Sequence, residues 1–265
     1  METFCDPDFA HLLTLHHLVE FDALWDLESK EVEDPNARRG GWSGVCRLCL
    51  SDGEGKTRCF FLKRQQNQLT HCGFLLTRRL ALRQEYASIL LCKKRNLPCP
   101  DVVLYCERKH SSTTNGKSIN NHQAMLITPA LDDFTPFSEI VSRWSILDET
   151  IRHHHLQELA RLIADLHKNR LSHNALNPNH LFINLTKDQK IKMIDMERMS
   201  FQIFRAKCRL KELETVLRTA GVFSAEETSF FLSKYCHFLP SGMPFEKLKK
   251  SIKKRFERKI PRRFF

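Results

Sequence analysis

Residues 171–197 read LSHNALNPNHLFINLTKDQKIKMIDME, and this stretch decides the fold. Pro178 stops any helix in the polar loop that opens it. Residues 181–183 form a short apolar strand, and residues 191–194 return with apolar and polar side chains alternating, which predicts a β-hairpin. Asp195 then stands alone at the end of a buried strand, where a carboxylate costs free energy unless it is compensated. A divalent cation is the natural compensation.

The composition is that of a globular protein. The chain has 265 residues, of which 42% are hydrophobic and 28% charged, enough for one two-lobed domain or two small ones. The sequence contains no run of about 18 apolar residues, so it predicts no transmembrane helix. The first residues, METFCDPD, lack the pattern of a signal peptide, so we expect a cytoplasmic protein.

The formal net charge of +11 is concentrated at the C-terminal end. Residues 241–265 predict a basic helix whose apolar positions fall on one face: Phe245, Leu248, Ile252 and Phe256. Such a tail can be a solvated basic segment, or it can be attracted to an anionic membrane surface. No motif supports nucleic acid, and we expect none as a partner.

Ten cysteines are scattered without a framework. Cys46 and Cys49 form the only close pair, but they lie in a predicted strand, where residues three apart face opposite sides. A zinc or redox site there is therefore not indicated. Because no secretion signal is visible, we expect the thiols to be reduced.

Three glycines, Gly40, Gly41 and Gly44, fall within five residues directly before an apolar strand. Such a turn can cradle a phosphate, although a plain hairpin turn remains an alternative. The next strand, residues 58–63, ends in Lys63. The helix predicted over residues 77–95 contains a single acid, Glu85.

Further elements follow from periodicity. Residues 109–121 are polar and predict a loop, whereas residues 149–168 and 201–220 predict helices. Ser224 followed by Glu227 predicts a capping box at the start of another helix.

The order of these elements resembles the lipopolysaccharide kinase family, the WaaP/InaA and Kdo-kinase group, and in particular its InaA-type branch. The segments that carry the resemblance are RRGGWSGV (38–45), FFLKRQ (60–65), SHNALNPNHLFI (172–183) and IDMER (194–198). It implies an α+β, two-lobed protein-kinase-like fold with a small β-rich N-lobe and a mainly helical C-lobe. The implied divisions are a lead-in (1–35), the N-lobe (36–128), the C-lobe (129–240) and the basic tail (241–265).

The resemblance also implies roles for individual residues. Lys63, held by Glu85, would contact the phosphates of ATP, beneath the glycine turn. Asp195 would hold Mg²⁺, and His180 stands where protein kinases place a second metal ligand. His173 matches the histidine of the catalytic loop.

Ala175 breaks the pattern, because it occupies the position of the catalytic Asp. A positioned base typically contributes about 10²- to 10⁴-fold to the rate. Glu197 is a candidate substitute, as a second metal ligand or relay base, although a surface pairing with a neighbouring arginine explains it equally well.

Two functions therefore remain open. The first is a kinase that transfers phosphate from ATP to a sugar hydroxyl of the lipopolysaccharide inner core, impaired or not by Ala175, at the inner face of the inner membrane. The second is a pseudokinase that binds nucleotide or partner proteins of lipopolysaccharide biogenesis without catalysis.

Overall fold

The computed structural model describes residues 2–28, 31–32, 36–38, 41–72, 77–114, 117–185 and 191–259. The chain divides into two compact units. Unit 1 comprises residues 1–90 and 100–132, and unit 2 comprises residues 91–99 and 133–265.

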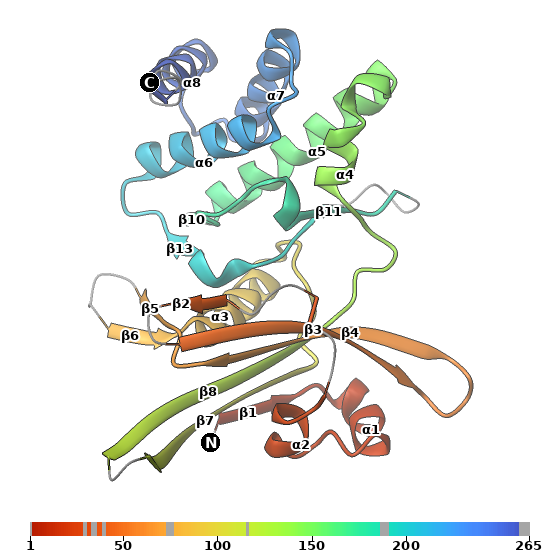
Figure 1. Ribbon diagram of the computed structural model, residues 1–265. Coiled ribbons are helices and arrows are strands. Elements are labelled where there is room, and N and C mark those ends of the chain that lie inside the picture. The colour runs from red at the N-terminus through yellow and green to blue at the C-terminus, as the bar shows by residue number, and fades with distance from the viewer. Residues whose placement is uncertain are drawn as a thin grey trace. The chain divides into compact units, whose positions relative to one another are not determined.

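Unit 1 is built on a six-stranded sheet in which every neighbouring pair of strands is antiparallel (Figure 1). Across the sheet the strands are β1 (Glu2–Cys5), β7 (Leu104–Thr114), β8 (Lys117–Pro129), β4 (Thr57–Gln66), β3 (Gly41–Ser51) and β2 (Asn36–Arg38). A separate hairpin of β5 (Leu69–Cys72) and β6 (Thr77–Leu80) leads into α3 (Ala81–Lys94). The predicted helix over 77–95 therefore begins four residues late, because residues 77–80 pair with β5.

The N-terminal residues belong to this unit. Besides β1, they form α1 (Pro7–Leu15) and α2 (Phe21–Trp25). Leu13 and Leu24, at 1% and 0% exposure, join Phe60 and Leu62 of β4 in one hydrophobic core. The described part of the predicted lead-in thus packs against the sheet.

The loop predicted over residues 109–121 is wrong for the residues described. The outer parts of β7 and β8 continue as a paired ladder, from Arg108↔Gln123 to Thr114↔Lys117. Backbone hydrogen bonds across the two strands define this part of the hairpin. Because the side chains there are polar, their pattern carried no signal for a strand.

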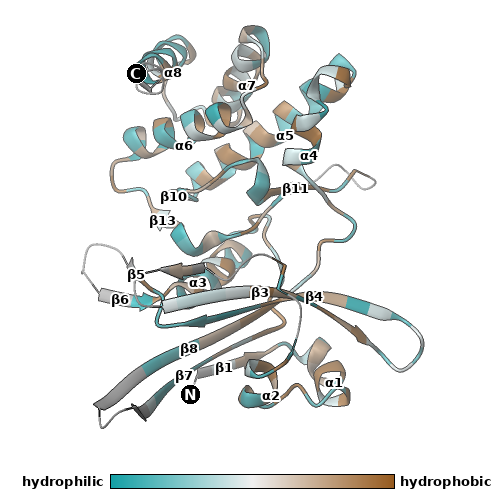
Figure 2. Ribbon diagram, viewed as in Figure 1, coloured by the Kyte–Doolittle hydropathy of each residue, from teal (hydrophilic) through white to brown (hydrophobic). Residues whose placement is uncertain are grey.

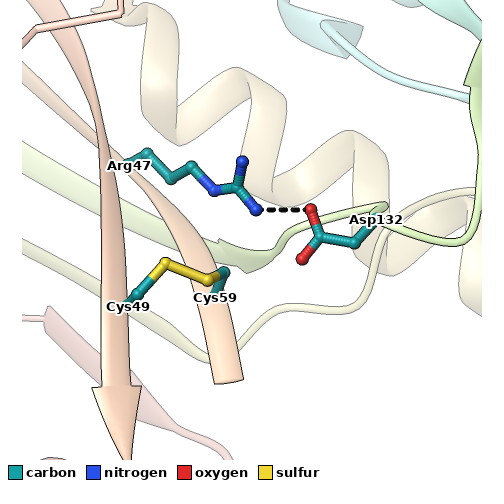
Figure 3. The surroundings of a disulfide bond; sticks show 4 residues. All are labelled: Arg47, Cys49, Cys59 and Asp132. Carbon is teal, nitrogen blue, oxygen red and sulfur yellow. Dashed lines mark hydrogen bonds and ion pairs between the residues drawn. A yellow bond between two sulfur atoms is a disulfide. The ribbon is translucent and has the colours of Figure 1, made fainter. Parts of the chain in front are cut away.

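Cys49 and Cys59 form a disulfide, which corrects the expectation that all thiols are reduced (Figure 3). The two residues are directly opposite each other on β3 and β4, with Cα atoms 4.1 Å apart. Residues that face each other as a non-hydrogen-bonded pair of an antiparallel ladder come close enough for such a bond. Cys46 is buried and Cys49 is exposed, as the strand alternation predicts.

Unit 2 is mainly helical. Its longest helix, α5 (Glu149–Lys168), buries one face as its spacing predicts, and most of its contacts are with α7 (Ala225–Phe238). The other helices are α4 (Phe137–Ser142), α6 (Arg205–Ala220) and α8 (Phe245–Lys259), with short 3₁₀ turns η2 (Trp144–Ile146), η3 (Pro178–His180) and η4 (Met196–Arg198). The capping box of Ser224 and Glu227 is confirmed.

Two small sheets complete unit 2. The hairpin predicted from the opening stretch is confirmed as β11 (Leu181–Ile183) and β12 (Ile191–Met193), with β9 (Thr135–Pro136) beside β11. The second sheet pairs β10 (Leu171–Ser172) with β13 (Ser200–Phe201). Residues 201–204, predicted as helix, therefore precede α6 as strand and loop.

Within the basic tail, residues 245–259 form α8, most of whose residues are hydrophilic (Figure 2). Leu248 and Ile252 are both only 2% exposed, and α8 packs against α6 and α7. The centre of the predicted apolar stripe is therefore used within unit 2 and is unavailable to a membrane. Eight of the described side chains of α8 are exposed. Six are basic (Lys247, Lys249, Lys250, Lys253, Lys254 and Arg258) and two are acidic (Glu246 and Glu257). No helix in the described ranges is long and apolar enough to cross a bilayer.

Candidate active site

Lys63 and Glu85 form the ion pair predicted from the sequence. Lys63 lies on β4 and donates from Nζ to both carboxylate oxygens of Glu85 on α3, at 2.7 and 2.9 Å. The lysine side chain is 23% exposed and the glutamate side chain 6%. Both residues belong to unit 1, so a fixed cation with one accessible side is built from this unit alone.

Gln65 sets the position of α3 relative to β4. Its Oε1 accepts a hydrogen bond from the backbone N–H of Leu82 at 3.0 Å, in the first turn of the helix. An unpaired N–H there would otherwise be buried at a cost. Gln65 is two residues after Lys63 on the same strand, so one strand holds both the lysine and the helix that carries its partner.

Gly41 and Gly44 lie where the Cβ atom of any other residue would clash with neighbouring atoms. A Cβ on Gly41 would lie 2.4 Å from the carbonyl oxygen of Gln66, and a Cβ on Gly44 would lie 2.8 Å from the carboxylate of Glu31. That carboxylate is paired with Arg64 at 3.0 Å. Gly40 lies outside the described residues. A phosphate-binding role for the three glycines stays a prediction.

In unit 2, His173 supports the backbone beside Asp195. Its ring is fully buried, and its Nε2–H donates to the carbonyl oxygen of Ile194 at 2.9 Å, since a carbonyl can only accept. Burial lowers the pKa of His173, so the imidazole is neutral at pH 7. The residue acts on Asp195 through the backbone and is a positioning residue.

Asp195 stands in a left-handed conformation, with φ 58° and ψ 58°. Few residues other than glycine adopt this conformation, and it is frequent where function demands it. The carboxylate is 35% exposed and lies 3.3 Å from Nε2 of His180.

His180 is oriented in the way that metal-ligating histidines usually are. Its Nδ1–H donates to the carbonyl oxygen of Ala175 at 2.8 Å. In the neutral ring the Nε2 lone pair then faces the Asp195 carboxylate, so two acceptors meet unless a proton or a cation lies between them. A backbone carbonyl on the second ring nitrogen is the common support of a histidine ligand. The pair therefore fits a divalent cation.

The protein supplies only part of a coordination sphere. Over the described ranges, no group of three or more His, Cys, Asp or Glu side chains is arranged to hold a metal. Mg²⁺ typically takes one or two carboxylates and completes its octahedron with water and substrate phosphates. A nitrogen ligand suits Mn²⁺ or Zn²⁺ better than Mg²⁺. Asp195 is thus the stronger of the two predicted ligands for Mg²⁺.

Ala175 presents no group that can accept a proton. Its carbonyl oxygen is taken by His180 and by the side-chain amide of Asn177, at 2.8 and 3.0 Å. Glu197, the predicted substitute, is 35% exposed and lies 3.6 Å from Nε of Arg198. The surface pairing weighed from the sequence is therefore present, and a role as base stays a prediction.

A buried network supports the loop, and the sequence reasoning missed it. Glu212 of α6 is 4% exposed; its Oε1 accepts from the backbone N–H of Asn174 at 2.9 Å, and its Oε2 lies 2.9 Å from Nε2 of His167. The other nitrogen of His167 lies 2.7 Å from the Tyr235 hydroxyl. Burial alone would raise the pKa of Glu212, but these hydrogen bonds and His167 outweigh it and hold the pKa below its ordinary value. Glu212 lies one turn before the buried Val216, so an acid stands on the apolar face of α6. This position of the acid was the signal in the sequence for a buried network.

The side chain of Asn174 joins the loop to the segment after Asp195. Its amide donates to the carbonyl oxygen of Arg198 at 2.9 Å and to the hydroxyl of Ser200 at 2.8 Å. Asn174 also has a positive φ of 64°. The polar loop and the residues that follow Asp195 are therefore held as one piece.

Comparisons with known proteins agree with this architecture. A solved structure described as WaaP in complex with acyl carrier protein superimposes with a TM-score of 0.70 at 17% identity, covering 100% of both chains. The predicted α+β, protein-kinase-like fold is thereby confirmed. No curated protein matches the sequence. A family model, that of the lipopolysaccharide kinase (Kdo/WaaP) family, matches residues 22–235. The match spans most of the chain, which therefore belongs to the lipopolysaccharide kinase (Kdo/WaaP) family.

Proposed function

We propose that this protein is an ATP-dependent kinase that phosphorylates a sugar hydroxyl of the lipopolysaccharide inner core. The observation that carries the proposal is the Lys63–Glu85 ion pair. A buried glutamate that fixes a partly exposed lysine on a strand suits the binding of nucleotide phosphates. Family membership supplies the substrate class.

Each residue has a distinct part in the proposed reaction. Lys63 would bind the α- and β-phosphates, and Glu85 would orient Lys63. Asp195 would hold Mg²⁺, with His180 as the second ligand and His173 as the support of the backbone. The bound cation would neutralise charge on the transferred phosphoryl group.

Because Ala175 cannot accept a proton, the position of the catalytic base offers no group for the proton of the attacking hydroxyl. Phosphoryl transfer depends mainly on positioning and charge neutralisation, so the loss of the base slows the reaction without abolishing it. Glu197, two residues after Asp195, is the proposed relay base. Its replacement by glutamine then lowers turnover sharply, and an unchanged rate removes Glu197 from the mechanism.

Ala175 also favours the second candidate function, a pseudokinase. Lys63, Glu85 and Asp195 are equally what a protein needs to bind nucleotide alone. The discriminating variant is Ala175→Asp, which restores an acid on an otherwise intact loop. A large gain in turnover shows that only the base was missing.

The decisive experiment measures ATP consumption and phosphate incorporation by the purified protein with Mg²⁺, with and without lipopolysaccharide core oligosaccharide. We expect acceptor-dependent turnover that is lost in Asp195→Asn and in Lys63→Met. Tight Mg-ATP binding without turnover would establish a pseudokinase that binds nucleotide. Absence of nucleotide binding would refute the kinase and leave only a pseudokinase that binds partner proteins.

Matched controls are available in unit 2. Asp165 and Lys168 form an exposed ion pair at 2.8 Å on α5, and such surface pairs contribute about 0–1 kcal/mol to stability. Asp165→Asn and Lys168→Met therefore repeat the two charge changes away from the proposed site and should leave turnover unaltered.

We also propose that the basic face of α8 contacts an anionic surface at the inner face of the inner membrane. Its six exposed basic side chains support this, since each can contribute up to about 1 kcal/mol near an anionic bilayer. The WaaP structure was determined with acyl carrier protein, so a protein partner is the alternative for this face. Binding to anionic vesicles and to acyl carrier protein, compared between the protein and a Lys253→Gln/Lys254→Gln variant, separates the two.

A further inference from the structure

In unit 2, the segment that runs from the end of β13 into the first turn of α6 exposes large apolar side chains. Phe201, Ile203 and Phe204 are 59%, 69% and 72% exposed. Three large apolar side chains held in water within four residues are unusual, because isolated exposed apolar residues are common but groups of them mark contact surfaces. We call residues 201–207 the apolar projection.

Hydrogen bonds from Gln202 fix the backbone of the projection. Gln202, between the exposed residues, is only 5% exposed. Its Nε2 donates to the carbonyl oxygen of Leu171 and to the hydroxyl of Ser172, both at 2.9 Å, and its backbone N–H donates to the carbonyl oxygen of Arg170 at 2.7 Å. The neighbours of Gln202 are thus directed outward by a fixed backbone, and little ordering is needed for them to make a contact.

The apolar side chains are flanked by positive charge. Arg205 and Lys207 are exposed at the start of α6, and the Arg198 side chain on the other flank is 64% exposed. No acidic residue occurs between Arg198 and Lys207. Apolar side chains with a basic border are typical of surfaces that enter the boundary between lipid headgroups and acyl chains.

We propose that the apolar projection inserts into an anionic phospholipid bilayer. Phe201, Ile203 and Phe204 enter the acyl boundary, while Arg205 and Lys207 remain among the headgroup phosphates. A bilayer is favoured over a protein partner by size. Together the three side chains offer roughly 500 Å² at most, whereas a stable protein interface buries about 800 Å² on each partner.

The inference deepens the proposed function. It rests on that function in one respect, namely that the substrate is a sugar carried by a lipid. Asn174, in the loop at the candidate active site, bonds to Ser200 directly before the projection. Insertion would therefore bring the Asp195 end of unit 2 to the membrane surface. It also assigns the apolar contact to a segment other than α8, whose central apolar residues are buried.

The test is co-sedimentation of the full chain, without nucleotide, with vesicles of equal parts phosphatidylglycerol and phosphatidylcholine. We expect binding that is lost by roughly tenfold or more in F201S/I203S/F204S. In R205Q/K207Q we expect a loss of roughly tenfold to thirtyfold and a weaker salt dependence. Because these side chains are exposed, the melting temperatures of both variants should match that of the unchanged protein.

Ile146→Ser is the matched control, because Ile146 is 80% exposed in the same unit and lies outside the projection. Its vesicle binding should be unchanged. Equal binding by F201S/I203S/F204S and the unchanged protein would overturn the proposal. So would a loss confined to binding of acyl carrier protein, which would make the projection a protein-docking surface. Absence of phosphotransfer with intact, projection-dependent vesicle binding would refute the proposed function alone.

Discussion

The Lys63–Glu85 pair predicts an unequal response to the removal of its two partners. At 2.7 Å and an effective dielectric constant of about 20, their attraction is roughly 6 kcal/mol. Desolvation of the nearly buried carboxylate costs several kcal/mol, so the net contribution of the intact pair is small. Lys63→Met leaves the carboxylate buried and uncompensated, which should cost about 3–5 kcal/mol of unfolding free energy.

The other two variants of this double-mutant cycle should lower the unfolding free energy by less. Glu85→Gln leaves a lysine that is 23% exposed and can be hydrated, so we expect a loss of about 1–2 kcal/mol. Lys63→Met/Glu85→Leu replaces the pair by apolar groups, which is often close to neutral, and we expect at most about 1 kcal/mol.

Tryptophan fluorescence during urea unfolding can follow unit 1 by itself. Trp25 and Trp42 lie in unit 1, with ring centroids 5.6 Å apart, and Trp144 lies in unit 2. A Trp144→Phe background therefore restricts the signal to the unit that contains the pair. If Lys63→Met costs no more than Glu85→Gln, or if the double variant costs the sum of the two, the glutamate is not compensated by the lysine and the reasoning fails.

Three further predictions concern stability. Replacing both Cys49 and Cys59 by serine should lower the unfolding free energy of the oxidised protein by roughly 2–3 kcal/mol; a reducing agent should cause the same loss in the unchanged protein and none in the variant. His155 is 3% exposed, and burial lowers its pKa from 6.5 to about 4, so the unfolded chain binds more protons between these values. The contribution of neutral His155 to the unfolding free energy should therefore be fully present above pH 6.5, and the unfolding free energy should fall by about 3 kcal/mol as the pH drops to 4. Urea titrations at several pH values should find this dependence much reduced in His155→Gln. Glu212→Ala leaves two buried donors without an acceptor and should cost about 3–5 kcal/mol, whereas Glu212→Gln keeps an oxygen for Asn174 and should cost less than half of that; equal losses in urea unfolding would contradict this account.

Local patterns predicted much of the fold and of the candidate site. The hairpin of β11 and β12 follows from alternation of side chains. The Lys63–Glu85 pair followed from the resemblance, which implies an acidic partner for the lysine on the next helix, where Glu85 is the only acid. The hairpin needed only the pattern of one short stretch, whereas the pair also needed the family's fold.

Features that depend on distant contacts were not predictable. The closeness of Gly44 to Glu31 and the acceptance of the Asn174 N–H by Glu212 depend on how separate elements pack, which no local pattern shows. The disulfide was missed because Cys49 and Cys59 meet only through the register of β3 and β4. The stripe on α8 was read correctly as amphipathic, but amphipathicity cannot tell a lipid surface from the flank of α6 and α7.

The pairing of β1 with β7 has a practical consequence for handling the protein. Four residues at the N-terminus cover part of the outer edge of an eleven-residue strand. An uncovered strand edge offers unpaired N–H and C=O groups to any other chain and is a common origin of aggregation. Chains shortened by even these few residues should therefore lose solubility before they lose the candidate site, and a cleavable tag at this end should be joined through a spacer that leaves β1 free to pair.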